Sequence, residues 1–170
     1  MKATLAVLAA TCVVAVPLLP ALAACEGETP LSVLDCYSQA YEDRDVDALD
    51  EVYASEYTWI DIVPPGALVF QRADAMKSAV GMFGHPDARA LSLSFGGDFA
   101  LVEDETDGTW RIEGVEVTLE ALYGDGDKPY TAKTCATYYV RNNGEGYEIF
   151  REVTIGDGGC DVWGDLLTSE

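Results

Sequence analysis

The sequence predicts an α+β domain, a cone-shaped roll in which N-terminal helices pack on a strongly curved, mainly antiparallel sheet and enclose a pocket. Apolar residues recur at spacings of three and four between residues 31 and 53, as they do in amphipathic helices. From residue 89 onward apolar and polar residues alternate instead, over long segments separated by Gly- and Asp-rich turns. Helices followed by a meander of strands are typical of α+β domains.

The first 24 residues are predicted to be an export signal. A positively charged start is followed by an uncharged apolar run that ends in small residues, and the motif ALA at residues 21–23 favours cleavage. An uncleaved anchor is the alternative, since about 20 apolar residues can span a bilayer. The expected location is therefore outside the cytoplasm, either periplasmic or secreted.

The rest of the chain is predicted to form a short lead over residues 25–30, one domain over 31–155 and a C-terminal tail over 156–170. A mature chain that spans residues 25–170 is long enough to bury roughly two-thirds of the surface that it exposes when unfolded. We therefore expect a single hydrophobic core.

The cysteines allow two interpretations of the start of the mature chain. The residues LAA before Cys25 resemble a bacterial lipobox, in which Cys25 would carry a lipid that tethers the protein to the envelope membrane. In an oxidising compartment, Cys25, Cys36, Cys135 and Cys160 can instead form disulfides. We expect the pairs Cys36–Cys135 and Cys25–Cys160, although Cys36 and Cys135 are also typical of small buried hydrophobic residues.

Two helices are expected at the start of the domain. Thr29 and Pro30 suit the cap and first position of a helix, and an apolar stripe that includes Tyr37 continues to about residue 43. Asp45 is then expected to cap a shorter helix with the sequence VDALDEVYA.

The next segment, YTWIDIVPPG at residues 57–66, is expected to be a strand that ends at two prolines and a glycine. Because side chains alternate along a strand, Tyr57, Trp59 and Asp61 share one face. The acid Asp61 therefore lies beside two aromatic rings. This face of the strand looks either into a partly dry cavity or onto the wet side of a sheet.

The remaining elements are predicted from the same two patterns, helical spacing of apolar residues and strand-like alternation. A short strand over 66–70 precedes a helix over 72–83, in which Ala75, Met76, Val80 and Phe83 have helical spacing. Alternating segments then predict long strands at 89–102, 115–123, 130–140 and 147–155. The strand at 115–123 is expected to bury Val115, Val117, Leu119, Ala121 and Tyr123 on one face.

The composition excludes several classes of partner. The chain has 30 acidic and 10 basic residues and a formal net charge of −20. Binding to nucleic acid or to anionic lipid needs a basic patch, so neither is expected, and membrane contact is limited to the signal or a lipid on Cys25. Disorder is also excluded, because 49% of the residues are hydrophobic.

The order of these elements resembles the nuclear transport factor 2-like superfamily, including its polyketide-cyclase-like (SnoaL-like) and ketosteroid-isomerase-like branches. The resemblance rests on RDVDALDEVYASEYTWID, the Pro-Gly turn, QRADAMKSAVGMF and the long strands after it, and it covers residues 31–154. It implies a cone pocket for a small apolar ligand, and homodimers are common in this superfamily. Function varies widely on one scaffold, so the fold alone does not assign an activity.

The resemblance to the isomerase branch implies two catalytic residues. Tyr37 matches the tyrosine that donates a hydrogen bond to the substrate oxygen, and Asp61 matches the aspartate that moves the proton. The second acid of that branch has no counterpart, since Cys135, Ala136 and Thr137 stand near its place, and Ile62 replaces the proline after the aspartate. These departures weigh against steroid-type isomerisation.

The neighbours of Asp61 suggest how it would act. Poor hydration beside Trp59 and Tyr57 would raise the pKa of the carboxyl toward a value useful for a general base, and a Tyr37 hydroxyl would stabilise a developing negative charge on oxygen. Tyr57, Trp59, Arg72 and Tyr138 are the expected ligand-binding residues. Arg72 resembles the arginine at the start of the third helix in the superfamily, where it can instead form a salt bridge.

No metal or cofactor is expected. His85 is the only histidine and lies between glycine and proline, and no cysteine or histidine spacing of a zinc site occurs.

The resulting hypothesis is an exported domain that binds a small apolar ligand, with acid–base chemistry of the isomerase, cyclase or dehydratase kind. The alternative is a non-catalytic interaction or dimerisation domain of the cell envelope, in which Trp59 and Tyr138 fill the cavity.

Overall fold

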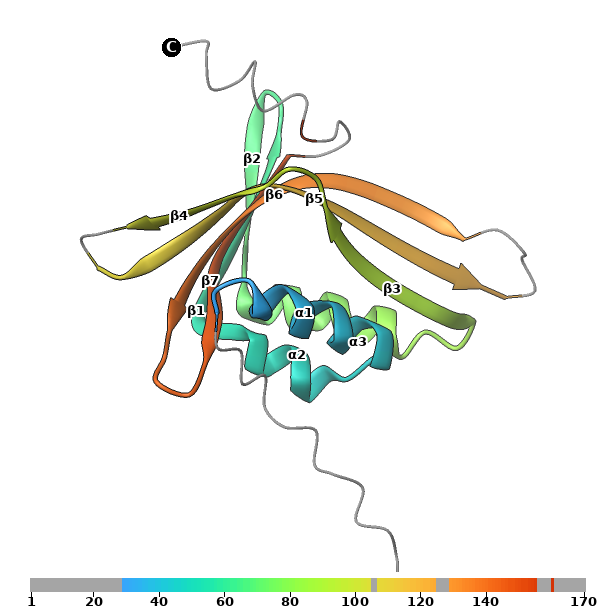
Figure 1. The fold of residues 1–170 in the computed structure, drawn as a ribbon. Helices are drawn as coiled ribbons and strands as arrows, with labels where there is room; N and C mark the ends of the chain where they lie inside the picture. The colour runs from blue at the N-terminus through green and yellow to red at the C-terminus, as the bar shows by residue number, and fades with distance from the viewer. Residues whose placement is uncertain (1–28, 105–106, 125–128, 156–159, 161–170) are drawn as a thin grey trace, which may run out of the picture.

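The computed structural model describes residues 29–104, 107–124, 129–155 and 160. It contains three helices and seven strands within these ranges: α1 (Ser32–Asp43), α2 (Val46–Val52), β1 (Tyr53–Val63), β2 (Gly66–Gln71), α3 (Arg72–Phe83), β3 (Ala88–Gly96), β4 (Ala100–Asp104), β5 (Thr109–Tyr123), β6 (Tyr130–Asn142) and β7 (Tyr147–Ile155). The helices lie together on one side of the sheet (Figure 1). The predicted α+β class is confirmed. The predicted export signal and Cys25 lie outside the described residues.

The strands form one mixed sheet in the order β2-β1-β7-β6-β5-β3, and β4 pairs with β5 beyond the bulge that interrupts that strand. Neighbouring strands are antiparallel except for β1 and β7, which are parallel. The sheet is not strongly curled, so the predicted strong curvature is not confirmed. The sheet stays open, because its edge strands β2 and β3 do not pair with each other to close a barrel.

Local interactions explain where the helices begin. The Asp45 side chain accepts hydrogen bonds from the backbone N–H groups of Asp47 and Ala48, both at 3.0 Å, as predicted for a cap of α2. The predicted cap of α1 is wrong, because the backbone carbonyl of Thr29, and not its side chain, accepts from Ser32. Helix α3 begins with a capping box between Gln71 and Asp74.

The core lies between the helices and the sheet. Its fully or almost fully buried members come from α1, α2 and the central strands, and they include Val33, Leu49, Ile112, Val115, Val140 and Ile149. The predicted inner face of β5 is largely confirmed, but Tyr123 is exposed at the end of the strand. Val80 is exposed, although it shares the helical spacing of the buried Phe83 and of the partly buried Ala75 and Met76.

The disulfide pairing differs from the prediction. Cys135 is bonded to Cys160, with 4.8 Å between their Cα atoms, so both predicted pairs are wrong. Successive side chains of a strand point to opposite faces, and Ala136 packs in the core on the helix side of the sheet. Cys135 therefore faces away from α1, which carries Cys36, and the sheet separates the two thiols. Cys36 is itself disulfide-bonded.

Within the described residues, no helix is long and apolar enough to cross a membrane.

Candidate functional site

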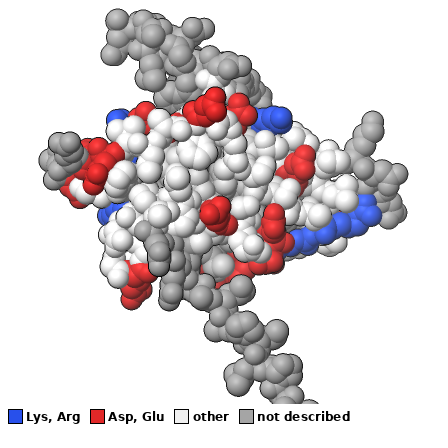
Figure 2. Space-filling model, in the orientation of Figure 1, with Lys and Arg blue, Asp and Glu red and all other residues white. Residues whose placement is uncertain are grey.

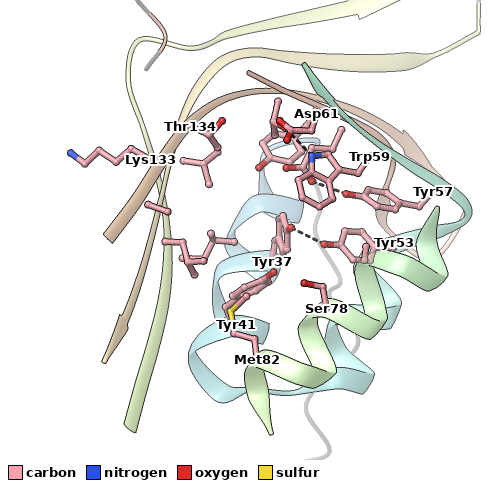
Figure 3. A pocket seen from close by; sticks show the side chains of 18 residues that line it. Tyr37, Tyr41, Tyr53, Tyr57, Trp59, Asp61, Ser78, Met82, Lys133 and Thr134 are labelled. Carbon is pink, nitrogen blue, oxygen red and sulfur yellow. Dashed lines mark hydrogen bonds between the residues drawn. The ribbon is translucent and has the colours of Figure 1, made fainter. Parts of the chain in front are cut away.

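A cavity of about 330 Å³ lies between the helices and the concave side of the sheet (Figure 3). Aromatic side chains dominate its wall, and two acids, Asp61 and Glu152, are among its lining residues. The wall consists of Tyr37, Tyr41, Tyr53, Tyr57, Trp59, Asp61, Ala75, Ser78, Met82, Leu93, Val117, Leu119, Ala132, Lys133, Thr134, Tyr138, Glu152 and Thr154. The predicted pocket is therefore present on the predicted side of the sheet.

Strand register brings the polar groups of the cavity together. The parallel pairing of β1 with β7 sets Trp59 beside Glu152, and the antiparallel pairing of β7 with β6 sets Glu152 beside Tyr138. Two residues further along β1, and on the same face, Asp61 lies beside Thr154. Paired residues on adjacent strands point to the same face. Two rows of polar and aromatic side chains therefore cross the sheet and face the helices.

Asp61 faces the cavity, as one of the two sequence interpretations predicts. Its Oδ1 accepts a hydrogen bond of 3.0 Å from the hydroxyl of Thr154, and that hydroxyl accepts one of 2.8 Å from Nε1 of Trp59. The side chain is half-buried, so its carboxyl has access to the cavity. The ring of Trp59 is held from its other side by a stacked contact with Phe70, with centroids 4.7 Å apart.

Glu152 is the buried acid of the site and was not predicted. Its side chain is only 6% exposed, and its Oε2 accepts a hydrogen bond of 2.7 Å from the hydroxyl of Tyr57. Burial raises the pKa of Glu152 to about 7, and the negative charge of Asp61 adds to this rise, while the hydroxyls of Tyr57 and Tyr138 act in the opposite direction. Glu152 is therefore present in both protonation states near neutral pH.

A bulge in β7 explains why the sequence pattern hides Glu152. Simple alternation would place Ile149, Arg151 and Val153 on one face and Glu152 on the other. In the structure, Tyr139 pairs with Arg151 and Val140 pairs with Ile149, which leaves Phe150 without a partner in the ladder. The extra residue reverses the alternation, so that Ile149 and Glu152 both face the core. No turn residue within YEIFREVTI marks this position.

Five tyrosines surround the two acids. The hydroxyl of Tyr53 donates a hydrogen bond of 2.7 Å to the hydroxyl of Tyr37, and the rings of Tyr53 and Tyr57 are stacked with centroids 4.1 Å apart. Burial raises the pKa of Tyr37, Tyr53, Tyr57 and Tyr138 well above the ordinary value and that of Tyr41 to about 12. All five hydroxyls are therefore neutral at physiological pH and can donate a hydrogen bond, as those of Tyr53 and Tyr57 already do within the protein.

The hydroxyl of Tyr138 is buried close enough to Glu152 to lower the pKa of that carboxyl, but it makes no hydrogen bond of acceptable geometry within the described residues. The side chain itself is 0% exposed and lies in the same row as Glu152. An unsatisfied buried hydroxyl is costly, and in native proteins such a group often marks a place that a ligand or water fills.

The structure brings together five of the six residues predicted for the site: Tyr37, Tyr57, Trp59, Asp61 and Tyr138 all line the cavity. Arg72 does not line it. Its guanidinium forms a salt bridge of 2.6 Å with Asp50 and donates to the backbone carbonyl of the same residue. Arg72 therefore ties the start of α3 to α2. No cluster of potential metal ligands occurs among the described residues.

Comparison with known proteins identifies the fold. No family model and no curated protein matches the sequence. A candidate scytalone dehydratase from Novosphingobium aromaticivorans superposes with a TM-score of 0.59 at 12% identity, over 74% of this chain and 80% of that one. An NTF2-like protein from Rhodospirillum rubrum superposes with a TM-score of 0.57 at 16% identity, over 77% and 100% of the two chains. The chain has the nuclear transport factor 2-like fold.

Another structure with the nuclear transport factor 2-like fold is that of a candidate aromatic ring hydroxylase from Novosphingobium aromaticivorans. It matches with a TM-score of 0.58 at 18% identity, over 74% of this chain and 85% of that one. At sequence identities this low, structural similarity establishes the fold and does not establish the chemistry of the cavity.

Two tyrosine substitutions should separate a satisfied hydroxyl from an unsatisfied one. We expect Tyr138→Phe to leave the free energy of unfolding unchanged or to raise it by up to about 1 kcal/mol, because it removes a buried group that has no partner. Tyr57→Phe should lower it by about 2 kcal/mol, because it removes the hydrogen bond to the buried Glu152. Urea unfolding measures both values. An equal loss in the two variants would contradict this account of Tyr138.

The raised pKa of Glu152 predicts a pH dependence of stability. In the folded state the group holds its proton up to about pH 7, whereas the ordinary value is 4.5. The folded state therefore binds more protons in this interval, so stability falls as the pH rises through it, by roughly 3 kcal/mol in total. The difference in unfolding free energy between the wild type and Glu152→Gln, measured from about pH 4 to about pH 8, isolates this contribution. A difference that stays constant would show that Glu152 has an ordinary pKa.

Proposed function

We propose that the cavity binds a small, largely apolar organic molecule and that Glu152 exchanges a proton with it. The observation that carries this proposal is a carboxyl group in the wall of a cavity, buried among aromatic rings, with a pKa of about 7. Perturbed carboxyl groups of this kind are typical of acid–base sites. The coarse class is that of isomerases, cyclases and dehydratases.

The size and lining of the cavity support ligand binding. Its volume of about 330 Å³ is within the range of pockets for small molecules. Trp59 and Tyr138 line this space and do not fill it. A cavity filled by these two side chains would have favoured a purely structural interaction domain, so the open volume supports the ligand-binding alternative.

The environment of Glu152 suits proton transfer. A general base or acid works best when its pKa is near the operating pH, because the reactive form is then well populated and the transfer is nearly balanced. Burial disfavours the ionised carboxylate, which therefore takes a proton readily from a substrate placed beside it. The hydrogen bond from Tyr57 fixes the orientation of the carboxyl and leaves Oε1 for the ligand.

Tyr37 supplies the second part of the proposed chemistry. Its hydroxyl oxygen accepts from Tyr53, so the two groups are fixed in position and the Tyr37 hydrogen can turn toward the cavity. A neutral donor held in this way stabilises negative charge that develops on a substrate oxygen when a proton leaves the adjacent carbon. In this proposal the proton-transfer role that the sequence suggests for Asp61 belongs to Glu152, which is the more deeply buried of the two acids.

A general probe of buried bases tests the proposal without knowledge of the natural substrate. The ring of nitrobenzisoxazole opens when a base removes its C–H proton, and the N–O bond then breaks to give a coloured cyanophenolate. We expect the protein to accelerate this reaction with a rate that rises with pH and levels off above about 7, because ionised Glu152 is the base. Glu152→Gln should lower the rate by about 100-fold.

The matched control is Glu120→Gln, which removes the same charge from an exposed position on β5 and should retain the wild-type rate. Rates that are equal in the wild type and in Glu152→Gln, or that do not exceed the buffer rate in the wild type, would contradict the proposed role of Glu152.

A further inference from the structure

Among the described residues, the charged groups that face into the cavity are acids. Asp61 and Glu152 both contribute carboxyl groups, and Lys133 is the only basic residue among the described residues that line the cavity. The side chain of Lys133 is exposed, and its ammonium group points away from the cavity (Figure 3). A carboxylate or phosphate ligand would therefore meet like charges and find no cation to bind.

We propose that the ligand of this cavity carries a positively charged nitrogen and that Asp61 is its anchor. This inference rests on the proposed function, since it takes the cavity as the ligand site and adds the chemical class of the ligand. The class is a small apolar or aromatic amine in its ammonium form. Glu152 then remains free to exchange a proton with another part of the same molecule.

The first support is that Asp61 has no cationic partner within the part of the chain that the structure describes. Other acids of the fold do have one: Asp50 pairs with Arg72, and Glu56 and Glu148 both pair with Arg141. Asp61 receives only the neutral hydroxyl of Thr154, at 3.0 Å on Oδ1. Half-buried beside Trp59, it can accept an ammonium N–H on the oxygen that Thr154 leaves unused.

The second support is the aromatic wall. Trp59 and five tyrosines line the cavity. The faces of such rings carry partial negative charge and attract ammonium groups within about 6 Å, most strongly where water is excluded. Aromatic residues that surround an acid thus provide two attractive interactions for a cation, one with the ring faces and one with the carboxylate.

The third support is an unsatisfied polar group in the cavity wall. The hydroxyl of Tyr138 is fully buried and has no hydrogen-bond partner among the described residues. An ammonium group has three donors and no acceptor, and a hydroxyl oxygen can accept from one of them. The same nitrogen, or a second polar atom of the ligand, would satisfy this group.

The net charge of the whole chain also favours a positively charged ligand. The net charge is −20, and acidic side chains are spread over the visible face of the molecule while basic ones lie near its edges (Figure 2). A negative potential of this kind raises the local concentration of small cations and lowers that of anions.

Three probes of similar size test the inference: benzylamine, which is an ammonium ion at neutral pH, and two neutral compounds, benzyl alcohol and acetophenone. Binding is followed by the NMR signal of the Trp59 indole N–H, which lies in the cavity wall. We expect benzylamine to bind at least about 10-fold more tightly than either neutral compound, because it gains a charge pair with the half-buried Asp61. Asp61→Asn should remove this preference, whereas Glu120→Gln, with the same loss of charge on the surface, should keep it.

The outcomes separate this inference from the proposed function. If a neutral compound binds as tightly as benzylamine, the ammonium class is wrong and the cavity remains a ligand site. If Asp61→Asn keeps the preference for benzylamine, Asp61 is not the anchor. If none of the three compounds changes the Trp59 signal, both the inference and the proposed ligand cavity are wrong.

Discussion

The parallel pairing of β1 with β7 is the constraint on which the site depends. It is the only parallel contact in the described sheet, and it sets Trp59 beside Glu152 and Asp61 beside Thr154. A shift of one residue in this register would turn Trp59 and Asp61 to the outer face of the sheet. The same pairing explains the unusual position of an acid among aromatic residues in YTWIDIV, because the alternation that points the rings into the cavity points Asp61 there as well.

A buried acid reduces the stability of the fold, and the surrounding side chains limit this cost. Glu152 receives a hydrogen bond from Tyr57 and holds its proton to about pH 7, so the fold does not have to bury a full negative charge at neutral pH. The tyrosines that neighbour it are neutral for the same reason, namely burial. The cavity therefore combines low polarity with groups that can donate and accept protons, which is a combination that general acid–base catalysis uses.

The sequence predicts the elements and one half of the site. The helical stripes, the start of α3 at Arg72 and the shared face of Tyr57, Trp59 and Asp61 follow from local periodicity, because each of these depends on residues close together in the chain. The inward direction of that face does not follow from periodicity, since it depends on the pairing of β1 with β7. Glu152 could not be found in this way. Its inward position depends on a bulge at Phe150, and its pKa depends on contacts with β1 and β6, which are distant in sequence. The disulfide was missed for a related reason, since only the alternation of β6 relative to the helices decides which face Cys135 occupies.

The most direct test of this account is a pH titration of the Glu152 carboxyl group itself. Isotope labelling of glutamate carboxyl carbons makes each group visible by NMR, and comparison with Glu152→Gln assigns the signal. The account predicts a midpoint near pH 7 for Glu152 and, because the charge of Asp61 contributes to this value, a lower midpoint in Asp61→Asn. A Glu152 signal that titrates near the ordinary value of 4.5 would contradict the central claim.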